Sequence, residues 1–197
     1  GDVYKRQSLS YDYSWDIEKN TASAADVSGA TSIYPSKYDL REKGRATTVK
    51  NQGSLGTCWA SASVSALETA LLPEESVQFS VDHMTLKNSF SQTQNDGGEH
   101  TMGMAYLTAW QGPVYEADDP YGDGESPDGL KPVKHVQEMQ VIEGKDFEKI
   151  KEAVFKYGGV QTSIYSALRS SQSQSEFYNS SKNAYCYIGT EKPNHDV

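Results

Sequence analysis

The chain has 197 residues, and its 18 Lys and Arg against 27 Asp and Glu give a formal net charge of −9 at pH 7. Its length fits one domain, or two small lobes that share a cleft, and its acidity disfavours nucleic acid and anionic membranes as partners. Its two cysteines exclude a disulfide-rich scaffold and a four-cysteine zinc site, and no apolar run approaches the ~18 residues of a membrane-spanning helix, so we expect no membrane insertion.

Residues 1–33 are predicted to form a disordered leader or linker. They are rich in Ser, Ala and Asp, and no helical or strand period persists in them. The opening residues 1–7 lack a starting Met and an apolar segment, and we interpret them as a processing or cloning remnant. The folded domain is expected to cover residues 34–197, with Pro35 marking its start.

Three helices are expected in the first part of this domain. Small and apolar side chains of residues 58–72 share one helical face, and Pro73 ends the run. The second helix follows Ser80, which is a suitable N-cap. The third helix covers about residues 99–110 and ends at the Gly-Pro pair that follows. We assign these helices to a helical lobe of about residues 50–115.

The second part, about residues 116–197, is predicted to be a β lobe. Asp146 is a suitable N-cap for a helix that ends before Gly158, and the Ser-rich stretch 166–181 is assigned to a loop. Strands are expected where Val, Ile and Tyr are frequent, at residues 133–142, 160–165 and 184–188. Helices followed by strands indicate an α+β fold.

The segment with the clearest chemical signature comes just before the first expected helix and reads Asn-Gln-Gly-Ser-Leu-Gly-Thr-Cys-Trp-Ala over residues 51–60. Its two glycines allow tight turns that deliver Cys58 to the first turn of the helix. Unpaired N–H groups and the helix dipole at that position favour an anion and lower the pKa of a thiol. The Gln52 amide and the Cys58 N–H would then form an oxyanion hole. The alternative is that Cys58 is a small buried hydrophobic residue.

This segment resembles the nucleophile motif of the papain-like cysteine peptidases. Three of its residues match that motif, namely Gly56, Cys58 and Trp59, and Thr57 stands in place of a Ser. His195 lies downstream of Cys58 within the window of ~130–150 residues at which this family carries its His. Further segments resemble the family in the same order, and they are residues 35–41, 78–80, 95–98, 118–121, 158–160 and 194–197.

The resemblance implies a papain-like two-lobe fold, with an N-terminal helical lobe, a C-terminal antiparallel β lobe and the active-site cleft between them. It implies a cysteine-type peptidase in which Cys58 and His195 form a thiolate–imidazolium pair and Gln52 helps to hold the oxyanion. Among the four histidines, His195 has both the distance and the flanking residues of the motif. We interpret His83 as a surface or interface residue and place His135 at the start of a polar strand.

The same resemblance assigns substrate-binding residues. Gly97 and Gly98 would let an extended substrate bind to their backbone, and the Asn194 carbonyl would accept a hydrogen bond near the cut bond. We hypothesise that Asp196, which replaces a usual Ala, makes the pocket for the second residue before the cut tolerate basic side chains. The alternative is that Asp196 faces solvent. By alignment, that pocket would be lined by His100, Ser163 and Asp196.

The chain departs from the family at two places. The third catalytic residue of the family, an Asn, follows the His, but this sequence ends soon after His195. We therefore expect a fragment that lacks the closing strands and has weak or no activity, whereas its full-length parent is active. Leu55 and Asp96 stand where many members carry a disulfide, and in this the chain resembles bacterial members more than animal or plant ones. The family resemblance implies an extracellular or cell-surface location. Cys186 is interpreted as a half-buried core or edge residue, not bonded to Cys58.

Two other functions remain open from the sequence. A catalytically silent papain-fold module on a cell-surface protein would use the cleft to hold peptides or glycans. A Cys-His hydrolase of another fold would act on cell-wall peptides or glutamine side chains. The combination of Gln52, Cys58 and His195 favours the peptidase, because a silent module needs no such set. For the peptidase we expect a peptide or protein substrate, a monomer, and neither a metal nor an organic cofactor.

Overall fold

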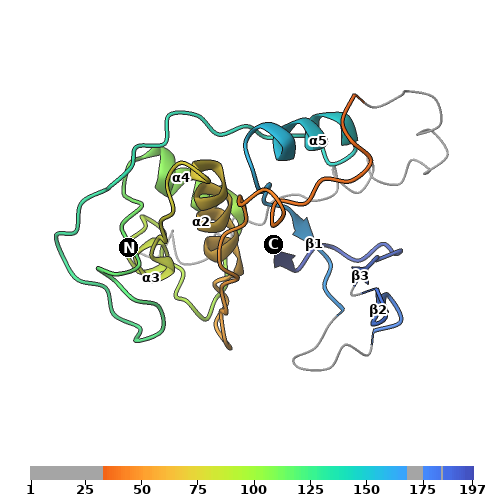
Figure 1. Cartoon of the computed structure of the whole chain (residues 1–197). Coiled ribbons are helices and arrows are strands. Elements are labelled where there is room, and N and C mark those ends of the chain that lie inside the picture. Colours follow the sequence, from red (N-terminus) through yellow and green to blue (C-terminus); the bar gives the residue numbers. More distant parts are fainter. Residues whose placement is uncertain (1–32, 168–174, 183) are drawn as a thin grey trace.

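The computed structural model describes residues 33–167, 175–182 and 184–197. The expected leader therefore lies outside the described residues, apart from its last position. Within these ranges the helices precede all of the strands (Figure 1). In chain order the elements are α2 (Cys58–Leu71), α3 (Val81–Leu86), α4 (His100–Thr108), α5 (Phe147–Lys156), β1 (Ser163–Ile164), β2 (Tyr178–Asn179), β3 (Ala184–Tyr185) and β4 (His195–Asp196).

Helix α2 is the central element of the helical part and packs against both α3 and α4 (Figure 1). Its buried face carries both apolar and polar side chains and begins directly after Cys58 with Trp59, which is 2% exposed. Burying a large apolar side chain stabilises a fold by about 1.5–3 kcal/mol, so this packing holds the first turn of α2 in place. The core of this part consists of Trp59, Ala60, Val64, Phe79, Val81, Met84, Met102, Tyr106 and Leu107.

Two of the predicted helix caps are confirmed. The Ser80 side chain accepts a hydrogen bond from the His83 N–H at 2.9 Å at the start of α3. The Asp146 side chain accepts one from the Lys149 N–H at 3.1 Å at the start of α5. Each cap satisfies a backbone donor that has no partner inside its helix.

The strands form two antiparallel pairs. In the first pair, Ser163 of β1 lies opposite Asp196 of β4, and Ile164 lies opposite His195. Helix α2 packs against β4. The second pair consists of β2 and β3, and Figure 1 shows it on the side of β1 and β4 that is away from α2. Helices that precede short antiparallel strands confirm the expected α+β class.

Two of the sequence-based assignments are wrong. Residues 133–142 form no strand, and three of their side chains pack on the helical core, namely Val133, Val136 and Met139. The Val133 N–H donates to the Pro113 carbonyl at 2.8 Å. A segment that packs through its side chains has the same composition as a strand, so the pattern did not separate the two. The stretch 166–181 contains β2, which pairs through Tyr178 with Tyr185 of β3. Residues 168–174 of that stretch lie outside the described residues.

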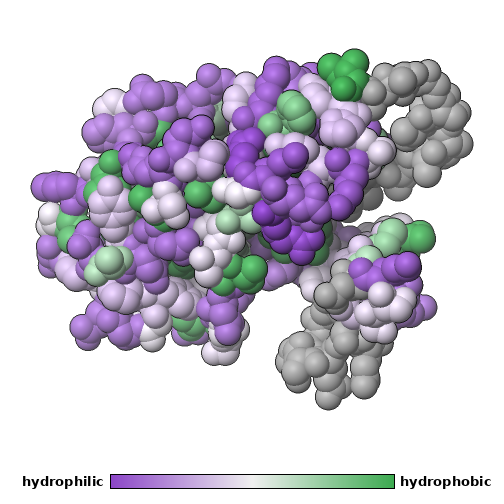
Figure 2. Space-filling view, viewed as in Figure 1, coloured by the Kyte–Doolittle hydropathy of each residue, from purple (hydrophilic) through white to green (hydrophobic). Residues whose placement is uncertain are grey.

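The face shown in Figure 2 is largely hydrophilic, and its hydrophobic residues are scattered rather than joined into one patch. Scattered apolar residues are normal on a protein surface. None of the helices in the described ranges combines the length and the apolar character that a membrane span requires.

Candidate active site

The loop that precedes Cys58 lies against the double-glycine loop of residues 95–98. The Gly56 N–H donates to the Gln94 carbonyl at 2.7 Å. A Cβ added to Gly56 would lie 2.7 Å from the Gly97 Cα, so a larger residue does not fit there. The structure thus brings the residues before α2 and the expected substrate-binding glycines to the same place.

Gly98 packs directly on the indole ring that follows the candidate nucleophile. A Cβ at Gly98 would lie 2.4 Å from Trp59 Nε1. Trp59 is buried in the core, as expected from the sequence. The absence of a side chain at position 98 therefore has a packing reason, and the role of the Gly98 backbone in substrate binding stays a prediction.

The candidate oxyanion-hole residue, Gln52, is held by its own loop. Its side-chain amide donates to the Leu55 carbonyl at 2.7 Å. A primary amide has two N–H donors, so this bond uses one and leaves the other for a ligand. The Gln52 amide is half-buried, which is the setting that an oxyanion donor needs.

Tyr121 also holds this loop in place, and the sequence analysis did not identify it as a site residue. Its hydroxyl donates to the Gln52 carbonyl at 2.9 Å and lies 2.7 Å from Thr57 Oγ1. It therefore joins both ends of the segment between Gln52 and Cys58. The signal in the sequence was the Asp-Asp-Pro-Tyr segment that ends at Tyr121, but the role of its hydroxyl depends on a long-range contact.

Cys58 and the strand that carries His195 meet at the N-terminus of α2. Cys58 is the first residue of α2, His195 is the first residue of β4, and the two elements pack together. Both side chains are half-buried. The backbone of Asp196 hydrogen-bonds to the Cys58 thiol, so β4 lies within hydrogen-bonding reach of the sulfur.

The environment of Cys58 raises the pKa of its thiol rather than lowering it. Burial is the largest cause, and the negative charge of Asp196 acts in the same direction. Hydrogen bonds from the backbone of Asp196, Trp59 and Cys58 itself favour the thiolate but do not reverse the shift. The expectation of a lowered pKa, based on the helix N-terminus alone, is therefore wrong, because it omitted the cost of burying the charged form.

Asp196 does not face solvent, since the residue is only 6% exposed. Its carboxylate accepts hydrogen bonds from Ser163 Oγ at 2.5 Å and from Gln161 Nε2 at 3.4 Å. The neighbouring Asn194 is exposed, and its N–H donates to the Ile164 carbonyl at 2.9 Å, which fixes the entry into β4. The pocket proposed for the second residue before the cut stays a prediction.

Two of the other histidines have structural roles. His83 is buried, its Nδ1 lies 2.6 Å from the Tyr106 hydroxyl, and burial lowers the pKa of its imidazole. The expectation of a surface or interface position is therefore wrong for His83. His135 lies outside any strand, and its ring packs on Trp110 with the ring centres 4.6 Å apart.

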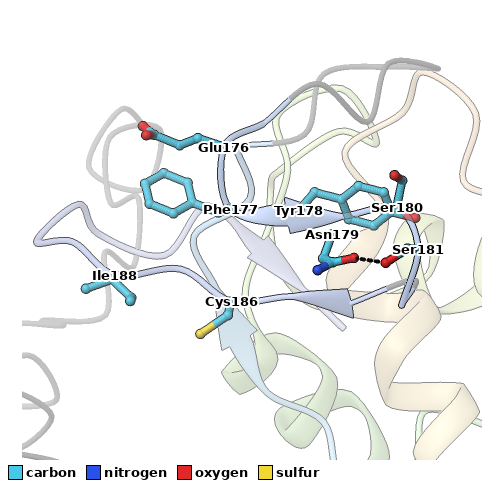
Figure 3. Close-up of a pocket in the computed structure, with 8 residues that line it drawn as sticks. All are labelled: Glu176, Phe177, Tyr178, Asn179, Ser180, Ser181, Cys186 and Ile188. Atoms are coloured by element: carbon cyan, nitrogen blue, oxygen red, sulfur yellow. Dashed lines mark hydrogen bonds between the residues drawn. The ribbon is translucent and has the colours of Figure 1, made fainter.

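Cys186 is exposed rather than half-buried. It lines a hollow of about 510 Å³ on the β2–β3 pair (Figure 3), which includes neither Cys58 nor His195. Figure 3 shows Cys186 and Ile188 on one side of the hollow and the residues of the β2 region on the other. Within the described residues, no group of His, Cys, Asp and Glu side chains is arranged to hold a metal ion.

The chain is similar in sequence to known cysteine proteases. It matches a family described as "Papain family cysteine protease" over residues 34–197. It is 32% identical to the cysteine protease Amb a 11.0101 of Ambrosia artemisiifolia over 168 residues, which are 83% of this chain and 42% of that protein. It is 28% identical to pro-cathepsin H of Bos taurus over 196 residues, or 94% of this chain and 57% of that protein. The chain thus spans about half the length of the curated relatives it matches.

The structure is also similar to solved cysteine proteases. The cysteine protease and lectin-like domains of Cwp84, a surface layer associated protein of Clostridium difficile, match with a TM-score of 0.64 and 27% identity over 86% of this chain and 39% of that chain. The proform of Amb a 11, a ragweed pollen allergen, matches with a TM-score of 0.60 and 30% identity over 89% of this chain and 53% of that chain. The chain belongs to the papain family of cysteine proteases.

Proposed function

We propose that the complete protein carrying this chain is a cysteine peptidase, with Cys58 as nucleophile and His195 as its acid–base partner. The observation that carries this proposal is the packing of α2, which begins at Cys58, against β4, which begins at His195. The family match over residues 34–197 supports the same reaction class. A silent binding module has no observation in its favour here.

The reaction proceeds through an acyl-enzyme. The Cys58 thiolate attacks the peptide carbonyl carbon, and the tetrahedral oxyanion accepts hydrogen bonds from the Cys58 N–H and the second N–H of the Gln52 amide. His195 then donates its proton to the leaving amine, the C–N bond breaks, and a thioester remains on the sulfur. A water molecule, deprotonated by His195, hydrolyses the thioester and releases the acid.

The raised pKa of the Cys58 thiol determines what His195 must do. A buried thiol gives up its proton only if the charge that forms is matched by a nearby positive charge. An imidazolium at His195 supplies that charge, and the backbone N–H of Asp196 adds a hydrogen bond to the sulfur. The nucleophile is therefore active as a pair and not as an isolated cysteine.

The substrate of the proposed peptidase is a peptide or protein in an extended conformation. The backbone of Gly97 and Gly98 and the carbonyl of Asn194 are the groups we assign to its main chain. Because the solved relative Cwp84 is described as surface layer associated, we propose that this protein also acts outside the cell, at a bacterial surface.

Hydrolysis of a fluorogenic peptide library by the complete protein tests this function. We expect Cys58→Ser and His195→Ala to lower kcat by at least about 10³-fold, and Gln52→Ala to lower it by about 10²–10³-fold. Cys186→Ser is the matched control, because this cysteine is exposed and lies on the β2–β3 pair, and it should leave kcat unchanged. Peptide hydrolysis that survives Cys58→Ser, or its absence from the wild-type protein, would contradict the proposal.

A further inference from the structure

Asp196 is a buried carboxylate whose hydrogen-bond donors are neutral. Its side chain accepts from the Ser163 hydroxyl at 2.5 Å and from the Gln161 amide at 3.4 Å, and the residue is 6% exposed. A buried charge is costly unless hydrogen bonds satisfy it, so this side chain is held where it is by specific partners. Its two bonds direct it inward, toward β1 and the residues that precede β1.

Gln161 extends this contact to the first turn of α2. The amide nitrogen that donates to Asp196 also donates to the Trp59 carbonyl at 3.2 Å. The amide oxygen accepts a hydrogen bond from Ser63 Oγ at 2.8 Å, and the same hydroxyl lies 2.8 Å from the Trp59 carbonyl. The Gln161 side chain thus uses both ends of its amide to connect Asp196 with two residues of α2.

The two ends of this connection flank the two candidate catalytic residues. Trp59 follows Cys58 on α2, and Asp196 follows His195 on β4. A helix and a strand that are far apart in the sequence are here joined by side-chain hydrogen bonds beside the reacting pair. A displacement of about 1 Å between two such groups lowers a rate by up to about 10²-fold, so the connection matters for chemistry as well as for packing.

We propose that Gln161 and Asp196 are positioning residues, which through the Gln161 amide fix the first turn of α2 relative to β4 and thereby set the geometry of Cys58 and His195. This inference rests on the proposed function. Both side chains act through the backbone that carries the pair. Asp196 stands where the family resemblance implies an Ala, which has no acceptor for such a bond.

The test uses Gln161→Met, Asp196→Ala and the double variant in the complete protein. We expect each single variant to lower kcat by about tenfold with less than about a twofold change in KM. Because the two groups form one connection, the double variant should lose about tenfold and not about a hundredfold. Asp196→Asn keeps an acceptor for Gln161 while the Ser163 hydroxyl can reverse its role, so it should retain most of the activity.

Gln111→Met is the matched control. Gln111 is also half-buried, and its amide donates to the Ser89 hydroxyl at 2.5 Å, after α3 and not beside β4. It should leave kcat unchanged. A second readout is the rate at which iodoacetamide alkylates Cys58 as a function of pH, which requires no substrate. Gln161→Met should shift that profile, and Gln111→Met should not.

Three outcomes would overturn the inference. One is independent effects that multiply in the double variant. Another concerns Asp196→Ala: its preference between Leu and Arg at the second residue before the cut changes, but its kcat on the better substrate does not. That result would make Asp196 a specificity residue. The third is a lower thermal midpoint with an unaltered kcat and alkylation profile, which would make the connection purely structural. If the wild-type protein hydrolyses no peptide, the proposed function fails, and the alkylation profile alone decides the positioning role.

Discussion

Replacing Gly98 by Ala is expected to damage the site through the buried indole of Trp59. A Cβ at position 98 would lie 2.4 Å from Trp59 Nε1 and 2.7 Å from two carbons of the ring. The ring must retreat by about 1 Å to restore van der Waals contact. Because Trp59 is enclosed by the core and only 2% exposed, it has no free space to enter, and overpacking of this kind costs about 1–3 kcal/mol.

The effect on catalysis should exceed the effect of backbone strain alone. Trp59 is the residue after Cys58, so a shift of its ring also moves the proposed nucleophile, and we expect kcat to fall by about tenfold. Gly44→Ala is the matched control, since Gly44 has a φ of +65° and a Cβ there would meet nothing within 4 Å. That variant should cost about 1–2 kcal/mol through its left-handed backbone and leave kcat unchanged.

Thermal unfolding of the complete protein gives the stability of each variant. Steady-state hydrolysis, measured below the unfolding midpoint of every variant, gives its kcat. Each kcal/mol lowers the midpoint of a domain of this size by about 2–4 °C. If Gly98→Ala had both the midpoint and the kcat of the wild type, the indole would have accommodated the methyl group. The packing explanation of Gly98 would then be refuted.

Four variants, one of them a control, test other contacts of the chain. Tyr121→Phe leaves a buried threonine hydroxyl without its partner, and urea unfolding should show a loss of about 1–3 kcal/mol, accompanied by a lower kcat. Lys50→Met removes the ion-pair partner of the fully buried Glu68 carboxylate, whose Oε1 lies 2.9 Å from Lys50 Nζ, and it should lower the free energy of unfolding by about 3–5 kcal/mol in the same assay. As a control, Lys37→Met breaks an exposed pair with Glu42 and should lower that free energy by less than about 1 kcal/mol. In His195→Ala, the pH midpoint for alkylation of Cys58 should move upward, because burial then raises the pKa of the thiol without an opposing imidazolium; an unchanged midpoint would show that the two residues are not a pair.

The elements that follow from local sequence were predictable. The bounds of α2, the Ser80 cap of α3 and the Asp146 cap of α5 each depend on residues that are close in the chain. The stretch 133–142 was mistaken for a strand because its neighbours are helices of the core and not another strand. Such a distinction depends on long-range packing, which composition does not contain.

In the candidate site, too, the features that depend on neighbouring residues were predictable and those that depend on long-range contacts were not. The motif around Cys58 was readable because its glycines, its amide and its cysteine are contiguous. The burial of His83 and the contacts of Asp196 were not readable, since Tyr106 and Gln161 come from distant parts of the chain. The sequence placed Asp196 either in a pocket or in solvent, and it offered no reason to consider a bond to Gln161.

Two interactions that stabilise a thiolate at Cys58 differ in strength, namely the helix N-terminus and a neighbouring imidazolium. A helix N-terminus stabilises an anion by about 0.3–1 kcal/mol, and by at most about 2 kcal/mol in a partly buried site. Two opposite unit charges about 4 Å apart attract each other by about 4 kcal/mol at an effective dielectric constant near 20, which corresponds to about three pKa units. Burial and the charge of Asp196 both oppose the thiolate, so in the proposed pair the imidazolium of His195 is expected to contribute more to the stabilisation of the thiolate than the helix N-terminus does. If this pair forms, the reactivity of Cys58 depends on the packing of β4 against α2.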